Sequence, residues 1–406
     1  MEQEKIWCAL KPTLFIDIVD DQLLSIYDTD TSTFMESTDR EFISVIGDFI
    51  SVHGRGCIEY SQDLLSMDFK KARALGYIST IKSKNRPLNL LPILNLQCDV
   101  EKGGNLSERI SLLGSKLAQI SGLKIELSSM LGDTNCQGNS RDLCEALDQY
   151  CIFSHAAKCK QLEVAQLNPL LKQLPITSIA ILDLYCSKKE FISSQNIQIL
   201  TQLVPDYMRI NIHMMADDYC ETKSMVEAVL SADKRLQLHL YADKRTGDRI
   251  LKECKSPKFK LHYFVYSQED MEYAEKLEGL IVCPVVLKDN IKWITGSLSL
   301  KKEEIQTQSY SFNHLFRNMK LNANFFGILD ITRNGEIKAH GSCIVLGRIA
   351  DGNFALIDSI SEEFKNNTSW RTTRNQYKKC AKCSLRYMCP PISIFELNGK
   401  LDTICI

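Results

Sequence analysis

The sequence lacks an excess of charge of either sign. Among its 406 residues, Lys and Arg total 49 and Asp and Glu total 50, so the formal net charge is −1. Without a broad positive field, we expect neither nucleic acid nor a membrane surface as a partner. The chain also lacks any run of about 18 apolar residues, the length that a membrane helix needs. Its start, MEQEKIWCALKP, lacks the regions of a secretion signal, so we expect a cytoplasmic protein.

Motifs of several common enzyme sites are also missing. No G-x-G-x-x-G follows a predicted strand, and the chain has no P-loop, G-x-S-x-G or H-E-x-x-H pattern. What is present is ample apolar material, 44% of the residues. A chain of this length is expected to hold two to four structural units, at roughly 100–200 residues each.

Residues 1–85 predict a small winged-helix-like domain. Short β-type runs in 13–36 are broken by turn-forming acidic residues, which predicts two or three antiparallel strands. A helix should then begin with Ser37 or Thr38 as its cap and carry apolar residues at helical spacing to residue 50. A second helix is predicted over 67–80, stopped near Gly76.

Residues 86–300 alternate near-continuous apolar strand candidates with amphipathic helices. This rhythm predicts parallel β/α units, arranged as a partial or full (β/α) barrel of the TIM-barrel-like kind. A doubly wound open sheet is the alternative. The predicted strands are 88–97, 123–129, 178–185, 207–214, 235–241, 259–266 and 280–287.

Residues 301–406 form the third predicted domain. Two β runs flank Asn334-Gly335, a strong hairpin signal. Further on, Cys380, Cys383 and Cys389 stand as C-x2-C-x5-C, a spacing in which thiolates can hold zinc or an iron–sulfur cluster. A fourth ligand would be Cys405 or Cys343. The alternative is a set of surface thiols that hold no metal.

This tail resembles the SPASM extension of radical SAM peptide maturases. The stretch NGEIKAHGSC is similar to the hairpin that leads to the first SPASM cysteine, here Cys343, and C-x2-C-x5-C matches at full spacing. The x3-C position holds Ser393. The resemblance implies one retained [4Fe–4S] cluster on Cys380, Cys383, Cys389 and Cys405, with Cys343 as the alternative fourth ligand.

The radical-generating motif of that family, C-x3-C-x2-C, is absent. The equivalent loop, LNLQCDVEKGGN, has Cys98 alone. In PILNLQCDV and CSLRYMCPP the chain resembles the pseudo-radical-SAM proteins of Bacteroidales systems for ribosomally made, modified peptides (RiPPs). The resemblance implies a protein without catalytic residues that does not use S-adenosylmethionine. It would bind a precursor peptide and assist a genuine radical SAM maturase. The assembly could be a homo-oligomer or a pair with an active homologue.

The N-terminal unit is similar to the peptide-recognition elements of peptide maturases, in which a leader peptide adds a strand to a sheet edge. Peptide-binding residues are then expected around Ser32, Thr33, Phe34 and Met35. A structural cap on the barrel is the alternative.

A different class of function rests on three histidines. His213, His239 and His262 fall one per predicted strand and could converge inside a barrel, near acids such as Asp183 and Asp217. The alternative function is therefore a redox or peptide-modifying enzyme that uses this site or the SPASM-like cluster.

Overall fold

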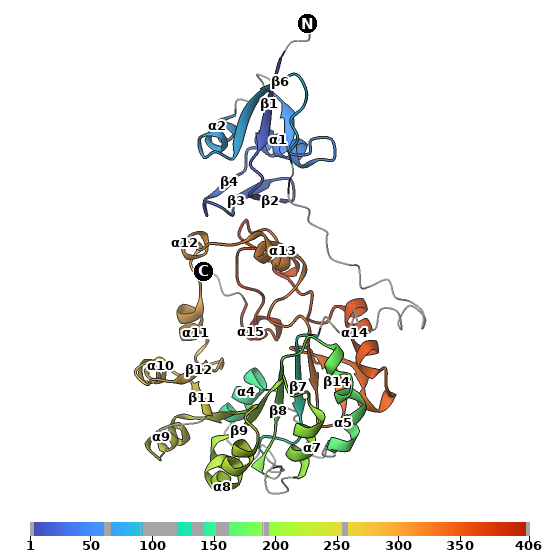
Figure 1. Cartoon of the computed structure of the whole chain (residues 1–406). Helices are drawn as coiled ribbons and strands as arrows, with labels where there is room; N and C mark the ends of the chain where they lie inside the picture. The colour runs from blue at the N-terminus through green and yellow to red at the C-terminus, as the bar shows by residue number, and fades with distance from the viewer. Residues whose placement is uncertain are drawn as a thin grey trace.

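The computed structural model describes residues 4–60, 66–89, 91, 120–131, 141–151, 162–188, 190, 195–253 and 259–402 (Figure 1). Most of the predicted strand 88–97 lies outside the described residues, as do Cys98 and Cys405. Within the described part of the chain, no helix is both long enough and apolar enough to cross a membrane.

Residues 4–89 form two antiparallel sheets of three strands, with two helices among the described residues. One sheet has the order β5-β1-β6 and the other β2-β3-β4. A winged-helix arrangement stays a prediction. The elements are β1 (Lys5–Leu10), β2 (Leu14–Val19), β3 (Leu23–Asp28), β4 (Phe34–Ser37), α1 (Arg40–Ile50), β5 (Cys57–Glu59), α2 (Met67–Ala74) and β6 (Ile78–Ser83).

The two predicted helices are present with different boundaries. The N-cap of α1 is Asp39, whose carboxylate accepts hydrogen bonds from the backbone of Glu41 and Phe42, so the predicted Ser37 or Thr38 cap was wrong. An ionised Asp satisfies the free N–H groups of the first turn and also favours the helix dipole. Helix α2 stops at Ala74, before Gly76 with a φ of +77°, as the glycine predicted.

The larger part of the described chain is built on a nine-stranded sheet. Its order is β12-β11-β10-β9-β8-β7-β13-β14-β15, parallel from β12 to β13 and antiparallel beyond. The sheet therefore continues across residue 300, where a domain boundary was predicted. The strands are β7 (Gly122–Glu126), β8 (Ile181–Tyr185), β9 (Arg209–Met215), β10 (Leu236–Ala242), β11 (Phe259–Val265), β12 (Leu280–Pro284), β13 (Ile328–Ile331), β14 (Glu336–Ala339) and β15 (Val345–Arg348).

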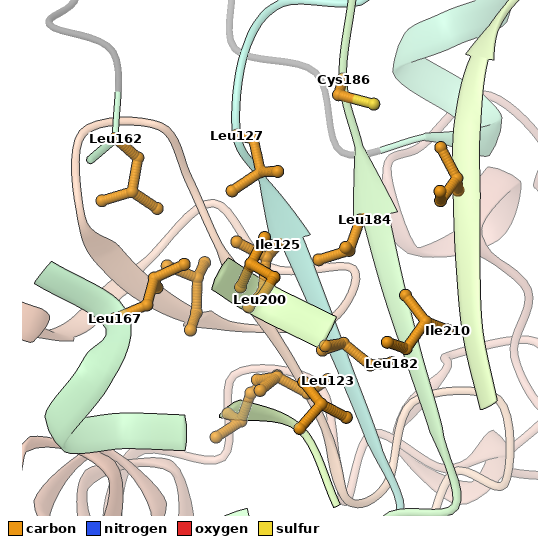
Figure 2. Close-up of a cluster of buried hydrophobic side chains, with 14 of the residues drawn as sticks. Leu123, Ile125, Leu127, Leu162, Leu167, Leu182, Leu184, Cys186, Leu200 and Ile210 are labelled. Carbon is orange, nitrogen blue, oxygen red and sulfur yellow. The ribbon is translucent and has the colours of Figure 1, made fainter. Parts of the chain in front are cut away.

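Helices cover the apolar face of this sheet, which explains the near-continuous apolar runs. Alternate strand residues such as Leu123, Leu182 and Ile210 are fully buried there (Figure 2). The same core takes side chains from α5 (Val164–Leu171), α7 (Gln195–Leu203), α8 (Ala216–Ala232), α9 (Lys244–Glu253) and α14 (Ala355–Asn366). A doubly wound fold would place such helices on both faces. The α/β prediction is confirmed; the sheet does not close within the described residues, so a barrel stays a prediction.

The described residues contain six more α-helices. They are α4 (Arg141–Tyr150), α10 (Gln268–Ala274), α11 (Ile291–Leu298), α12 (Lys302–Gln306), α13 (Phe312–Lys320) and α15 (Ile394–Leu397). The predicted hairpin is confirmed as β13 and β14, joined by a turn in which Gly335 has a φ of +76°.

The sheet β2-β3-β4 is joined to the cysteine-containing segment by an apolar cluster and by polar contacts. Phe15 and Tyr27 from this sheet pack with Leu315, Tyr387 and other residues of the C-terminal region. Figure 1 places β2, β3 and β4 on the side of the N-terminal unit that faces α12 and α13. One sheet of the N-terminal unit is thus engaged with the rest of the chain.

Candidate functional site

The three predicted cysteine ligands lie in a tight series of turns between residue 376 and α15. The backbone N–H of Cys383 donates to the carbonyl of Cys380 at 2.9 Å, and that of Cys389 donates to Leu385 at 2.9 Å. Cys380 and Cys389 are buried, and Cys383 is half-buried. The segment is a compact knuckle with two of its three thiols turned away from solvent.

Arg374 holds both ends of this knuckle. Its guanidinium donates to Cys380 Sγ at 3.6 Å and to the Pro390 carbonyl at 2.7 Å. It also forms two bonds to the Glu396 carboxylate, at 2.8 and 3.2 Å. Burial alone would lower the pKa of Arg374, but Glu396, Cys380 and the charge of Cys389 raise it above its ordinary value. A fixed cation beside these buried thiols would offset the charge of a ligated site.

The described cysteines do not make a metal site by themselves. Among the residues that the structure describes, no three His, Cys, Asp or Glu side chains are grouped so that they could hold a metal ion. Cys405 lies outside those residues, and Cys343 is exposed after β14. Thiolates are the right donor type for zinc or iron–sulfur, and a cluster that includes Cys405 stays a prediction.

The residues predicted to bind a peptide are partly exposed, except for the buried Met35, and all four make contacts within the chain. Met35 lies in the N-terminal core, and Phe34 packs in the apolar cluster with the C-terminal region. The Ser32 hydroxyl is 2.8 Å from that of Ser309, and Tyr77 donates to the Thr33 hydroxyl at 2.9 Å. Ser32 and Phe34 thus contact the C-terminal region, whereas Thr33 and Met35 make contacts within the N-terminal unit, and their binding of a peptide stays a prediction.

The polar face of the nine-stranded sheet gathers ionisable side chains from neighbouring strands. His213 Nε2 is 2.9 Å from the Asp183 carboxylate, and its Nδ1 is 2.9 Å from the Tyr241 hydroxyl. Asn211 also donates to Asp183, at 2.8 Å. Burial lowers the pKa of His213, although the Asp183 carboxylate acts in the opposite direction. Burial would raise the pKa of Asp183, but its hydrogen bonds with His213 and Asn211 lower it below the ordinary value. The pair is thus a neutral imidazole donating to a carboxylate.

His239 and His262 complete the predicted trio. His239 Nδ1 and His262 Nε2 are 2.9 Å apart, and His262 Nδ1 is 3.8 Å from Cys283 Sγ. Burial, with a smaller effect of neighbouring charges, lowers the pKa of His239 to about 3 and that of His262 to about 4. Burial raises the pKa of Cys283 to about 12. All of these groups are neutral at pH 7, and Nε2 of His239 has no partner among the described residues.

Sequence reasoning predicted part of this face correctly. The three histidines and Asp183 do come together, whereas Asp217 lies at the start of α8 and binds Thr246 and Arg249.

A second Asp–His pair was not predicted from the sequence. His340 Nδ1 is 2.9 Å from Asp330, and its Nε2 is 3.0 Å from Lys124 Nζ. Lys124 is opposite Asp330 on one side and Asp183 on the other, because β7 lies between β13 and β8. The sequence signal is the period-two alternation of charged and apolar residues in β7 and β13, but their pairing is not visible from the sequence.

Helix α4 covers the polar face at the carboxyl ends of the strands. Its Ala146 and Leu147 pack with Tyr185, Tyr241 and other residues of the strand ends. The Gln149 amide exchanges two hydrogen bonds with the backbone of Val286, at 2.8 and 3.0 Å. In β/α proteins the carboxyl ends of the strands are where substrates bind, so α4 occupies that position here.

Neither models of known protein families nor curated proteins match this chain.

Proposed function

We propose that this chain is a non-catalytic pseudo-radical-SAM protein. It binds a ribosomally synthesised precursor peptide in the cytoplasm and assists a genuine radical SAM maturase. The observation that carries the proposal is that the two sheets of the N-terminal unit have different surroundings. The sheet β2-β3-β4 packs against the C-terminal region, whereas β6 in the other sheet has an edge with which no described strand pairs. An open edge binds extended peptides through backbone hydrogen bonds.

The absence of catalysis is supported by two features. The sequence has no C-x3-C-x2-C motif, so three irons cannot be held with one left open for S-adenosylmethionine. In addition, α4 packs on the buried rings of Tyr185 and Tyr241 at the strand ends. Reconstituted protein incubated with S-adenosylmethionine and a reductant should release no 5′-deoxyadenosine, and its release would refute the proposal.

Peptide binding can be tested on the full chain without knowing the precursor. Immobilised protein would be offered a displayed library of random 12-residue peptides, and enriched sequences would be synthesised and titrated. We expect saturable binding in the micromolar range or tighter. A library that yields no peptide with saturable binding would contradict the proposal.

For the cofactor, we propose a [4Fe–4S] cluster on Cys380, Cys383, Cys389 and Cys405. Protein purified without oxygen should contain about four iron and four sulfide per chain. Replacing Cys383 by Ser should remove them, and replacing the buried Cys186 should not. One zinc per chain would indicate a structural zinc site, and neither metal would refute both.

A second candidate function is a peptide-modifying enzyme that uses the polar face. It is favoured by two buried atoms on adjacent strands, Nε2 of His239 and Oδ1 of Asn211, which have no hydrogen-bond partner among the described residues and lie beside the Asp183–His213 pair. In a co-expressed maturation system, His213→Gln would then abolish a mass change in the peptide while leaving peptide binding intact. If modification is unaffected, this candidate is excluded.

A further inference from the structure

The outer edge of β6 is unpaired among the described residues and unusually exposed. β6 pairs along its whole length with β1, from Ile78 opposite Leu10 to Ser83 opposite Lys5. No strand in the described part of the chain pairs with its other edge. Four consecutive residues, Ser79 to Lys82, are exposed, so both faces of the strand are accessible along this edge. At the end of the strand, the Ser83 carbonyl accepts a hydrogen bond from Trp7 Nε1 at 3.2 Å.

This edge is flanked by a dense group of cations. Residues 66–89 contain six Lys or Arg and one acid, Asp68, a local charge of +5 in a chain of net charge −1. All six cations are exposed. Arg86 donates to the carbonyls of His53 and Cys57, beside β5 at the opposite side of the sheet, and does not flank this edge. We call β6 together with the other five cations the basic edge; these are Lys70, Lys71 and Arg73 on α2 and Lys82 and Lys84 on or after β6.

The cations of the basic edge are not neutralised within the described chain. None of the five is in an ion pair with a described carboxylate. Helix α2 packs against this sheet through Phe69 and Ala72, in the core that also contains Ile78 of β6, so its cations lie close to the sheet.

Protection against aggregation does not account for this pattern. A lysine on an edge strand deters pairing with another copy, and Lys82 alone would do that. The three cations on α2 lie outside the strand and add nothing to that protection, but they extend the positive field alongside it. This wider positive field attracts a ligand of opposite charge.

We propose that the basic edge binds an extended, acidic peptide segment as an added strand of the sheet β5-β1-β6. The backbone groups of β6 pair with the peptide, and the Asp or Glu side chains of the peptide lie beside the cations of α2 and beside Lys82 and Lys84. This rests on the proposed function and deepens it by naming the seat and the charge of the bound segment. An acidic peptide fits better than a nucleic acid, because a free strand edge offers the alternating donors and acceptors of a peptide backbone.

The test is fluorescence anisotropy on the full chain with three labelled probes. They are a 12-residue peptide alternating Glu and Val, its Lys–Val counterpart, and a 12-nucleotide oligo-dT. We expect the Glu–Val peptide to bind at least tenfold more tightly than the other two probes. The same peptide would also be made with every second backbone nitrogen methylated, starting from either the first or the second residue, and one of these two forms should bind at least tenfold more weakly. Equal or tighter binding of oligo-dT, or no effect of N-methylation in either register, would overturn the proposal.

Charge-reversal variants test whether the peptide binds at the basic edge. Lys82→Glu/Lys84→Glu should weaken the Glu–Val peptide at least tenfold, whereas Lys276→Glu, at an exposed lysine just after α10, should change binding less than twofold. If peptides from the random library bind but are insensitive to the double variant, peptide binding stands and the basic edge is refuted as its seat. If no peptide binds at all, both proposals fail.

Discussion

Removing Arg374 should open the cysteine knuckle locally. The side chains of Arg374 and Glu396 are 3% and 0% exposed, so Arg374→Ala leaves a carboxylate buried without its cation. Such a loss costs about 3–5 kcal/mol. At 1.36 kcal/mol per factor of ten, the open state of the segment becomes roughly 150- to 5,000-fold more populated.

The thiol of Cys380 reports this opening, because it is 4% exposed and next to Arg374. Its alkylation rate would be followed by mass spectrometry, after a chelator has removed any metal. The rate should rise by that factor in Arg374→Ala, while Cys186, fully buried in the sheet core, reacts as in the unchanged protein.

Two controls separate the buried pair from ordinary charge effects. Lys379→Ala removes an ion pair with Asp402 whose side chains are 66% and 86% exposed, so it should alter the rate at most a few-fold. Arg374→Met/Glu396→Leu removes both buried charges and should restore slow alkylation. A change below tenfold in Arg374→Ala would refute the reasoning, and so would a double variant that reacts as fast as the single one.

Three further predictions concern the sheet. Because burial lowers the pKa of His239 to about 3 and of His262 to about 4, both charge on unfolding below pH 6.5. Stability to urea should therefore fall from about pH 6.5 toward pH 4, by up to about 1.4 kcal/mol per pH unit for each histidine, and His239→Gln should make this dependence shallower. Tyr241→Phe removes the hydroxyl that bonds a buried imidazole and should cost about 1–3 kcal/mol in the same measurement. Gly247→Ala should cost about 1–3 kcal/mol, since its Cβ would lie 2.6 Å from the Tyr263 ring; an unchanged urea midpoint would contradict this.

The parallel strands were predictable because each is apolar enough to be recognised locally. The runs 207–214 and 235–241 became β9 (Arg209–Met215) and β10 (Leu236–Ala242). The strand β6 was not predicted. Four of its six residues are exposed, and its polar and apolar residues do not alternate. It exists because it pairs with β1, which is about 70 residues away in the sequence.

The polar face shows the same limit. Each of these predicted strands has one histidine at an equivalent position, which predicted that His213 and His239 would be neighbours. They are neighbours, with ring centres 4.7 Å apart. The contact between Lys124 and His340 depends on β13 pairing with β7 across some 200 residues. No local pattern encodes that pairing, because it follows from which apolar faces share one core.

The contacts between the N-terminal unit and the cysteine knuckle bear on how a bound peptide could be presented. Arg386, between Cys383 and Cys389, forms two bonds to Asp17 of β2, at 2.8 and 2.9 Å. Burial raises the pKa of Asp17 even against this cation, so the pair is sheltered from solvent and its loss is costly. The bond runs between the sheet β2-β3-β4 and the knuckle. A peptide added at β6, as proposed, would therefore bind a unit whose other sheet is anchored to the knuckle. The anchoring contacts lie on β2-β3-β4, whereas no described strand pairs with the outer edge of β6.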